Sequence, residues 1–312
     1  MLRQRLMIMT LLWASVAAGD PIELTPGEFT AKLNGLRLWY KVSGQGPVCI
    51  MPTPGWGPSS DLYFRTLTPL EDTFTVVYLD TRGTGRSERA ASTIEYTWDH
   101  FVDDLEALRE HLGQAKVWLM GHSEGGVHVM QYTLKHPDHV SGLILLTTHA
   151  SMDQQRWIDV QRRMELRSSE PWYAEARKAL ETLGEATNAD QWRKNLIAAL
   201  PFYLSDVAKL PDCQKHWRAE WMSYDAFRGS IDSKRIPFTL VDQLGRIKAP
   251  TLIVVGDDDF ICSPTAAQQL HLGIPNSKLL LIEDAGHFPW LEQPEAFFSG
   301  VHSFLPVLGL GQ

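Results

Sequence analysis

The residues best suited to chemistry in this chain form the segment Gly121-His122-Ser123-Glu124-Gly125-Gly126. An apolar run typical of a strand precedes the segment, and a run with helical periodicity follows it. In that setting, G-x-S-x-G is typical of a sharp turn that projects a serine above the edge of a sheet. Small residues flank the serine because such a strained turn leaves little room for side chains. We therefore expect Ser123 to be a nucleophile.

A serine hydroxyl needs a base to take its proton, and the base needs a third group to orient it. The apolar run 251–255 is followed by Gly256-Asp257-Asp258-Asp259, and the run 279–282 is followed by a segment that contains Gly286-His287. In chain order, an acid and then a histidine after later strands are the partners that this type of turn requires. The predicted catalytic residues are Ser123, Asp259 and His287.

The elements that must position these residues alternate between strands and helices. Apolar runs indicate strands at 48–51, 74–79, 116–120, 140–146, 251–255 and 279–282, and helical periodicity indicates helices at 99–112, 127–134, 265–272 and 294–304. Before them, 29–33 and 36–42 flank Asn34-Gly35, the commonest two-residue hairpin signal. We predict an α/β fold with a mostly parallel sheet flanked by helices.

Residues 151–244 interrupt this alternation. They are charged, have helical periodicity and contain five of the eleven tryptophans, namely Trp157, Trp172, Trp192, Trp217 and Trp221. We predict a helical cap inserted into a core formed by 20–150 and 245–312. Since helical caps often roof an apolar pocket, we expect some cap aromatics to bind substrate, although aromatics of amphipathic helices also serve simply to pack on the core.

These motifs resemble the α/β-hydrolase superfamily and, within it, the proline iminopeptidase-like branch, over residues 29–304. The family's G-x-x-D usage favours Asp259 over Asp257 and Asp258 as the acid, with Asp153 at the family's rarer position. Its G-H-x-x-x-x-E pattern matches Gly286-His287 followed by Glu292. The resemblance implies the α/β-hydrolase fold and hydrolytic activity without a cofactor.

An oxyanion hole requires two backbone N–H groups that point at the developing negative charge. Glu124, directly after the nucleophile, is expected to supply one. The resemblance places the other in the loop after the strand 48–51, where the family has H-G-x-P-G and this chain has Met51-Pro52-Thr53-Pro54-Gly55. Because proline has no N–H, Thr53 is the predicted donor and Trp56 the alternative.

We predict no metal and no cofactor. The chain has no H-E-x-x-H motif, and His136 and His139 have no obvious third ligand nearby in the sequence. His122 is expected to be a packing residue. The glycine-rich segment 80–87 lacks the spacing of a nucleotide-binding P-loop. The predicted substrate-binding residues are Trp56, His149, Trp217 and Trp221.

The charge balance limits the class of partner. The 29 lysines and arginines against 37 aspartates and glutamates give a net charge of −8, which is unfavourable for binding phosphate backbones. Cys49, Cys213 and Cys262 are too widely spaced for a zinc ribbon or a disulfide scaffold. We expect a small-molecule or short-peptide substrate and no nucleic acid, and the oligomeric state stays open.

The N-terminus has the layout of a secretory signal peptide over residues 1–19. Arg3 and Arg5 precede the apolar run 6–13, and small residues lead to Gly19. The run is shorter than the roughly 20 residues of a membrane span, so we predict no such span. A secreted or periplasmic location is expected, with a cytoplasmic one as the alternative.

The predicted function is a serine hydrolase that cleaves a carboxylic ester or lactone of an apolar substrate. One alternative is a proline iminopeptidase-like aminopeptidase, for which the cap offers the amine-binding candidates Glu165, Glu170, Glu175, Glu220 and Asp225. For Glu124 we weigh a salt bridge within the fold against binding of a substrate cation. An alternative from another class is a non-hydrolytic ligand-binding or biosynthetic protein that keeps the triad as scaffold.

Overall fold

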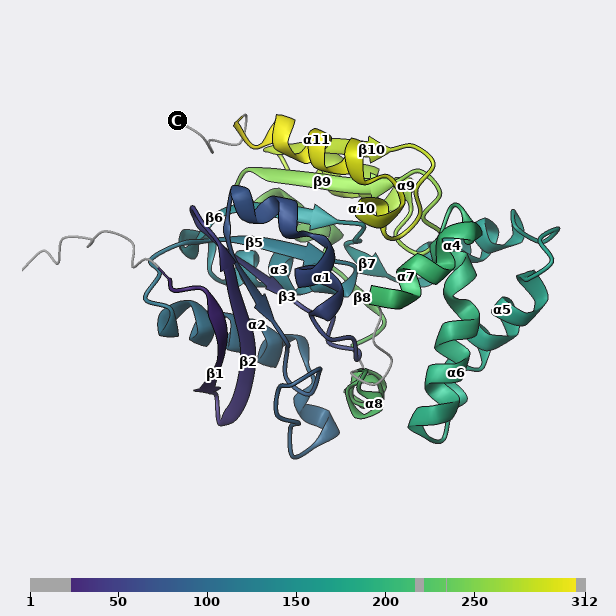
Figure 1. Cartoon of the computed structure of the whole chain (residues 1–312), viewed down its shortest axis with the longest axis horizontal. Helices are drawn as coiled ribbons and strands as arrows, with labels where there is room; N and C mark the ends of the chain where they lie inside the picture. The colour runs from purple at the N-terminus through teal and green to yellow at the C-terminus, as the bar shows by residue number, and fades with distance from the viewer. Residues whose placement is uncertain (1–23, 217–221, 234, 307–312) are drawn as a thin grey trace, which may run out of the picture.

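The computed structural model describes residues 24–216, 222–233 and 235–306 (Figure 1). The predicted signal peptide at 1–19 lies outside the described residues, as do Trp217, Glu220 and Trp221. Among the described helices, none combines the length and the apolar character needed to cross a bilayer.

A sheet of eight strands forms the centre of the fold, in the order β1-β2-β4-β3-β5-β6-β9-β10 (Figure 1). β1 pairs antiparallel with β2, and β2 with β4, whereas the other neighbouring strands pair in parallel. The turn between β1 and β2 places Asn34 and Gly35 at φ of 47° and 86°, as the hairpin signal predicted. The predicted α/β fold with a mostly parallel sheet is therefore confirmed. The strands are β1 (Gly27–Leu33), β2 (Leu36–Gly44), β3 (Val48–Pro52), β4 (Thr75–Leu79), β5 (Val117–His122), β6 (Val140–Leu146), β9 (Thr251–Gly256) and β10 (Ser277–Ile282).

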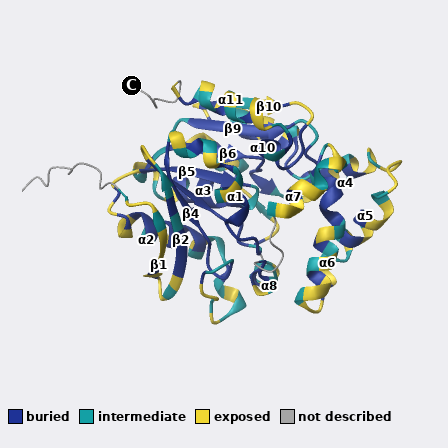
Figure 2. Cartoon of the chain, viewed as in Figure 1, coloured by how far each residue is buried: buried dark blue, intermediate teal, exposed yellow. Residues whose placement is uncertain are grey.

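Helices cover both faces of the sheet, so the central strands are buried on both sides (Figure 2). Leu119 and Leu143 pack on one face with helices α2, α3 and α9. Their neighbours Trp118 and Ile144 point to the other face and pack with α1 and α11. These helices are α1 (Asp61–Thr66), α2 (Trp98–His111), α3 (Glu124–Lys135), α9 (Pro264–Gly273), α10 (Pro289–Glu292) and α11 (Pro294–Phe304).

Short helices fill the segment that we predicted to be a cap. Figure 1 shows α4 to α7 together beyond one end of the sheet. Two short strands, β7 (Ser151–Met152) and β8 (Phe238–Thr239), pair antiparallel and bring the two ends of the segment together. The helices are α4 (Gln154–Glu165), α5 (Tyr173–Glu181), α6 (Ala189–Ala199), α7 (Leu210–His216) and α8 (Tyr224–Asp232). The division into core and cap stays a prediction.

Candidate active site

Ser123 occupies the sharp turn between β5 and α3. Its backbone has φ 54° and ψ −128°, a conformation that residues other than glycine rarely adopt. A Cβ on Gly121 would lie 2.5 Å from the carbonyl oxygen of Gly125, and one on Gly126 would lie 2.4 Å from the Thr148 hydroxyl. The turn therefore needs glycine at both positions, and it holds Ser123 in a strained conformation.

Asp259 and His287 meet at the carboxyl ends of the neighbouring strands β9 and β10. Asp259 Oδ2 lies 2.8 Å from His287 Nδ1, and both side chains are buried. The other carboxylate oxygen, Oδ1, accepts the N–H groups of Ile261 at 2.9 Å and Cys262 at 2.8 Å. The carboxylate is thus fixed by backbone donors on one side and orients the imidazole on the other.

The other candidate acids have different partners. Asp257 accepts the N–H of Ala285, Asp258 pairs with Arg167, and Asp153 accepts the N–H of Arg156 as the N-cap of α4. Among these four aspartates, only Asp259 contacts His287.

Two further groups hold the histidine loop in place. Glu292 accepts the N–H of Gly286 at 2.7 Å with one oxygen and the N–H of Ser205 at 2.7 Å with the other. His122 bonds through Nε2 to the carbonyl of His287 at 3.1 Å and through Nδ1 to the Tyr63 hydroxyl at 2.9 Å. Burial and the neighbouring His287 hold the pKa of His122 well below its usual range, so His122 stays neutral and supports the loop.

Ser123 and His287 line one cavity of about 160 Å³. Among the described residues, no hydrogen bond joins the Ser123 hydroxyl to the imidazole. In structures without substrate, such contacts are often longer than in the reacting complex. The Cys262 thiol also lies close, within 4.8 Å of donor atoms of Asp259 and His287, but burial raises its pKa, so the thiol stays protonated.

The loop after β3 differs from the prediction made for the oxyanion hole. The Thr53 N–H donates to the Leu79 carbonyl at 3.0 Å, and the Thr53 hydroxyl bonds to Thr81 and Thr84. The Thr53 amide continues the ladder between β3 and β4, so it does not face the site. The N–H groups of Gly55 and Trp56 interact with the Glu124 carboxylate.

Apolar side chains form most of the cavity wall. Trp56 and His149 line it, as predicted. Burial, and secondarily the charge of Arg156, lower the pKa of His149 to about 3, so it is neutral at the pocket wall. Tyr203, one of the cap aromatics, lines it too. No local pattern in the sequence marks the other lining residues as parts of a pocket: Pro54, Pro58, Leu62, Tyr63, Met152, Ile236, Phe238, Ile261 and Phe288.

Glu124 is the one carboxylate among the described residues that line this cavity. Its Oε1 lies 3.2 Å from Nη1 of Arg235, so of the two interpretations of Glu124 the salt bridge within the fold is confirmed. The Arg235 guanidinium is buried and lies 5.0 Å from the ring centres of Trp98 and Phe101. Burial raises the pKa of Glu124, whereas the Arg235 charge and the two loop amides oppose that increase.

The amine-binding candidates of the cap lie elsewhere. Glu165 pairs with Arg177 and Asp225 pairs with Arg89, while Glu170 and Glu175 are exposed. Of these four described carboxylates, none lines the cavity around Ser123.

A family model for the alpha/beta hydrolase fold matches residues 50–294. The chain therefore belongs to the α/β-hydrolase family, and it is an enzyme of the serine hydrolase type.

Curated relatives and solved structures agree with this assignment. The chain is 28% identical over 284 residues to proline iminopeptidase PfmaB of Pestalotiopsis fici, covering 88% of this chain and 98% of that protein. It is 27% identical over 293 residues to the proline iminopeptidase of Saccharolobus solfataricus, covering 88% and 90%. An alpha/beta fold family hydrolase from Bacillus anthracis superposes with a TM-score of 0.73 at 19% identity, over 89% of this chain and 99% of that one. These relatives place the chain in the proline iminopeptidase-like branch.

Proposed function

We propose that Ser123, His287 and Asp259 catalyse hydrolysis by acyl transfer. Ser123 Oγ attacks a carbonyl carbon while His287 takes its proton, and Asp259 orients the imidazole and stabilises its charged form. His287 then returns the proton to the leaving group, and water releases the acyl group by the reverse sequence. The N–H of Glu124, at the start of α3, stabilises the oxyanion. The 2.8 Å contact between Asp259 and His287 supports these roles.

The substrates that we propose are small apolar esters or lactones. The supporting observation is the composition of the cavity wall, in which Glu124 is the lining carboxylate and Arg235 balances its charge. A free N-terminal amine needs an anionic partner to replace its water, and an already paired carboxylate is a poor one. An uncharged ester needs only apolar contacts and the oxyanion donor at Glu124.

The aminopeptidase remains the second candidate function. It is supported by the similarity to proteins named proline iminopeptidase, at 27% to 28% identity. Glu124 Oε1 contacts Arg235, whereas Oε2 is buried and has no hydrogen-bond partner among the described residues, so for this function the substrate amine would bind to Oε2.

A comparison of two substrates tests the proposal. We expect the full chain to hydrolyse p-nitrophenyl butyrate with a higher kcat/KM than proline β-naphthylamide. If the prolyl amide is the better substrate and Glu124→Gln removes that preference, the enzyme is an aminopeptidase. The Ser123→Ala variant is the matched control for background hydrolysis.

Labelling with a fluorophosphonate addresses the non-hydrolytic alternative. An activated serine forms a covalent adduct with this reagent, and we expect the adduct on Ser123. A chain that neither reacts with the reagent nor turns over either substrate would instead be a binding or biosynthetic member of the family.

We also propose that the chain is exported, on the basis of the basic and apolar pattern of residues 1–19. N-terminal sequencing of the mature protein should begin near Gly19. Recovery of Met1 on the mature protein would contradict export by this route.

A further inference from the structure

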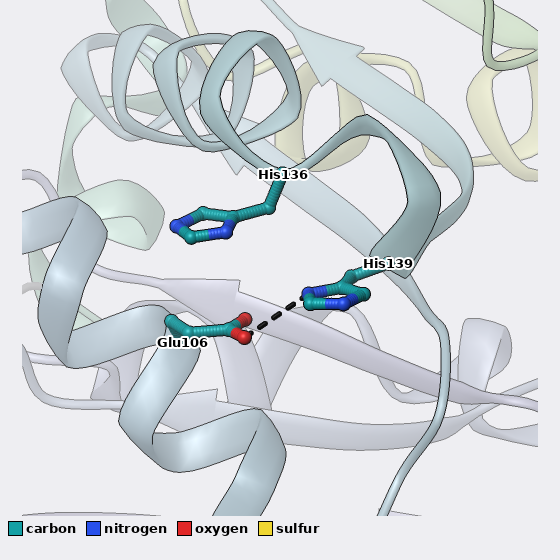
Figure 3. Close-up of side chains that lie close together, drawn as sticks. All are labelled: Glu106, His136 and His139. Carbon is teal, nitrogen blue, oxygen red and sulfur yellow. Dashed lines mark ion pairs between the residues drawn. The ribbon is translucent and has the colours of Figure 1, made fainter.

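Three side chains from two parts of the chain converge at the C-terminal end of α3 (Figure 3). Glu106 lies on α2, His136 is the C-cap of α3, and His139 ends the short 3-10 helix η3 (Pro137–His139). One nitrogen or oxygen atom from each residue lies within 4.8 Å of the other two. The sequence offered no third ligand beside His136 and His139, and the fold supplies one.

The two imidazoles each have a nitrogen without a hydrogen-bond partner. His139 Nδ1 is shielded from solvent and makes no hydrogen bond to any described residue. The shielded and unpartnered nitrogen of His136 is Nε2, which lies on the side of its ring away from Glu106 and His139, so Nδ1 is the nitrogen that faces the other two side chains (Figure 3). His139 Nδ1 lies 3.0 Å from Glu106 Oε1, but the orientation does not meet that of a hydrogen bond. Buried nitrogens without partners are uncommon and point to a bound water or ion.

Glu106 is held in an orientation that suits a ligand. Arg109 donates to Oε1 at 2.7 Å and to Oε2 at 2.9 Å, and the Tyr132 hydroxyl donates to Oε2 at 2.5 Å. A carboxylate has about four acceptor positions, so these three bonds leave one, on the oxygen nearest to His139. The hydrogen bond from Arg109 lowers the pKa of Glu106 to about 2, and the group is therefore anionic at neutral pH.

We propose that Glu106, His136 and His139 form a binding site for a divalent transition-metal ion such as Zn²⁺, with water completing the coordination shell. Two imidazoles and one carboxylate suit Zn²⁺ or Ni²⁺ better than Ca²⁺ or Mg²⁺, which prefer oxygen ligands. Two ligands that are each about 2.1 Å from a metal lie about 3.4 Å apart at the tetrahedral angle of Zn²⁺ and about 3.0 Å apart at the right angle of a square-planar or octahedral shell. The separation of His139 Nδ1 and Glu106 Oε1 is 3.0 Å.

The position of the site indicates a structural role. A cation at the C-terminus of α3 interacts favourably with the helix dipole. The ion would also connect α2 to the end of α3. Since α3 has 12 residues, it separates the site from Ser123 by about 18 Å, so we expect the metal to stabilise the fold without entering the reaction.

Titration of the full chain with ZnCl₂ after removal of metals with EDTA tests the site. We expect isothermal titration calorimetry to show one Zn²⁺ per chain, with affinity reduced at least tenfold in His136→Ala and in His139→Ala. Zn²⁺ should raise the Tm of the wild type and not that of His136→Ala. The control His302→Ala removes a half-buried histidine of α11 and should bind Zn²⁺ like the wild type.

Other outcomes overturn the proposal. A wild type that binds no Zn²⁺, or that binds MgCl₂ equally well, excludes a transition-metal site. If Cys262→Ser removes binding and His136→Ala does not, the ion binds to Asp259, Cys262 and His287 instead, where it should inhibit ester hydrolysis. The Tm of each variant without metal shows whether it folds. Because binding and Tm need no substrate, this test is independent of the proposed function.

Discussion

Backbone groups determine the orientation of the catalytic side chains at the scale of single residues. The two N–H groups bound to Asp259 Oδ1 leave Oδ2 free for His287, and Glu292 holds the backbone in front of that histidine. The geometry of the Asp259–His287 pair is therefore established before substrate binds. Such a prearranged pair needs little reorganisation during the reaction.

The matched variants Asp259→Asn and Asp258→Asn test the assignment of the acid. We expect Asp259→Asn to lower kcat by about 10⁴-fold, because an amide favours the wrong tautomer of His287. Asp258 pairs with Arg167 at a partly exposed position, so Asp258→Asn should change kcat less than about threefold. Steady-state kinetics with p-nitrophenyl butyrate measures both. Equal losses in the two variants would contradict the triad.

His128 should make stability depend on pH. It is fully buried, its ring stacks on Phe101 with centroids 4.4 Å apart, and neither nitrogen has a partner among the described residues. Burial, with the charge of Arg235, holds the pKa of His128 well below the ordinary value for histidine. Below about pH 6.5 the unfolded chain therefore binds more protons than the native chain. For every pH unit by which the pH falls in this range, each buried neutral histidine lowers the free energy of unfolding by up to about 1.4 kcal/mol.

The variant His128→Leu isolates this contribution. We expect it to change stability little at pH 8, since an unpartnered polar group is replaced by an apolar one. Between pH 6.5 and 5, the variant should lose less stability than the wild type, although His122 and His149, whose pKa values are also lowered, keep part of the dependence. Urea denaturation at each pH measures the free energy of unfolding of both proteins. If this free energy falls equally with pH in the wild type and in His128→Leu, His128 does not contribute to the pH dependence.

At the scale of elements, the junction of β5 and α3 depends on space that glycine leaves. Gly121→Ala places a Cβ 2.5 Å from the Gly125 carbonyl oxygen, whereas the nearest atom to a Cβ on Gly125 is the Pro52 carbonyl oxygen at 3.1 Å. We expect Gly121→Ala to displace Ser123 and to reduce fluorophosphonate labelling by at least tenfold, and Gly125→Ala to have the smaller effect. If Gly121→Ala is labelled at the rate of the wild type, the turn tolerates a Cβ at this position and the prediction is wrong.

The pair of Glu124 and Arg235 joins α3 to the segment that ends the predicted cap. Arg235→Met leaves a buried carboxylate without its cation and should lower the free energy of unfolding by about 3 kcal/mol. Adding Glu124→Gln to that variant should recover a large part of the loss, because no charge then remains unpaired. Urea denaturation of the two single variants and the double variant measures the coupling. Additive losses would show that the two side chains do not interact.

At the scale of the whole molecule, the cavity combines residues of the sheet loops with residues of the predicted cap. Ser123 and His287 come from the former, and Met152, Tyr203 and Phe238 from the latter. A volume of about 160 Å³ is close to that of an apolar cavity of about 150 Å³ that holds benzene. The pocket thus suits a short acyl group.

The dependence of activity on acyl chain length tests whether the pocket holds a short acyl group. We expect kcat/KM for p-nitrophenyl butyrate to exceed that for the decanoate by at least tenfold, because a decanoyl chain extends beyond the cavity. Met152→Ala should enlarge the pocket and thereby reduce the ratio of the two kcat/KM values. Ile197 is an exposed residue of α6, so Ile197→Ala should leave this ratio unchanged. A preference of the wild type for the decanoate would show that the cap segment opens to admit long chains.

The sequence by itself determined the features that depend on local patterns. Strand and helix periodicity predicted the alternation around the sheet, and the glycines around Ser123 predicted the turn, because a sharp turn and a buried strand restrict residue types over a few consecutive positions. The order of the acid and the histidine along the chain predicted the pair that lies 2.8 Å apart.

Only the tertiary structure decided the contacts between residues that are distant in the chain. Thr53 donates its amide to Leu79, Arg235 neutralises Glu124, and Glu106 joins His136 and His139. No local pattern encodes these pairs, since a backbone amide or a charged side chain looks the same in the sequence whichever partner it finds. Their partners are chosen by the packing of helices and strands, which brings distant segments together and excludes the water that would otherwise satisfy them.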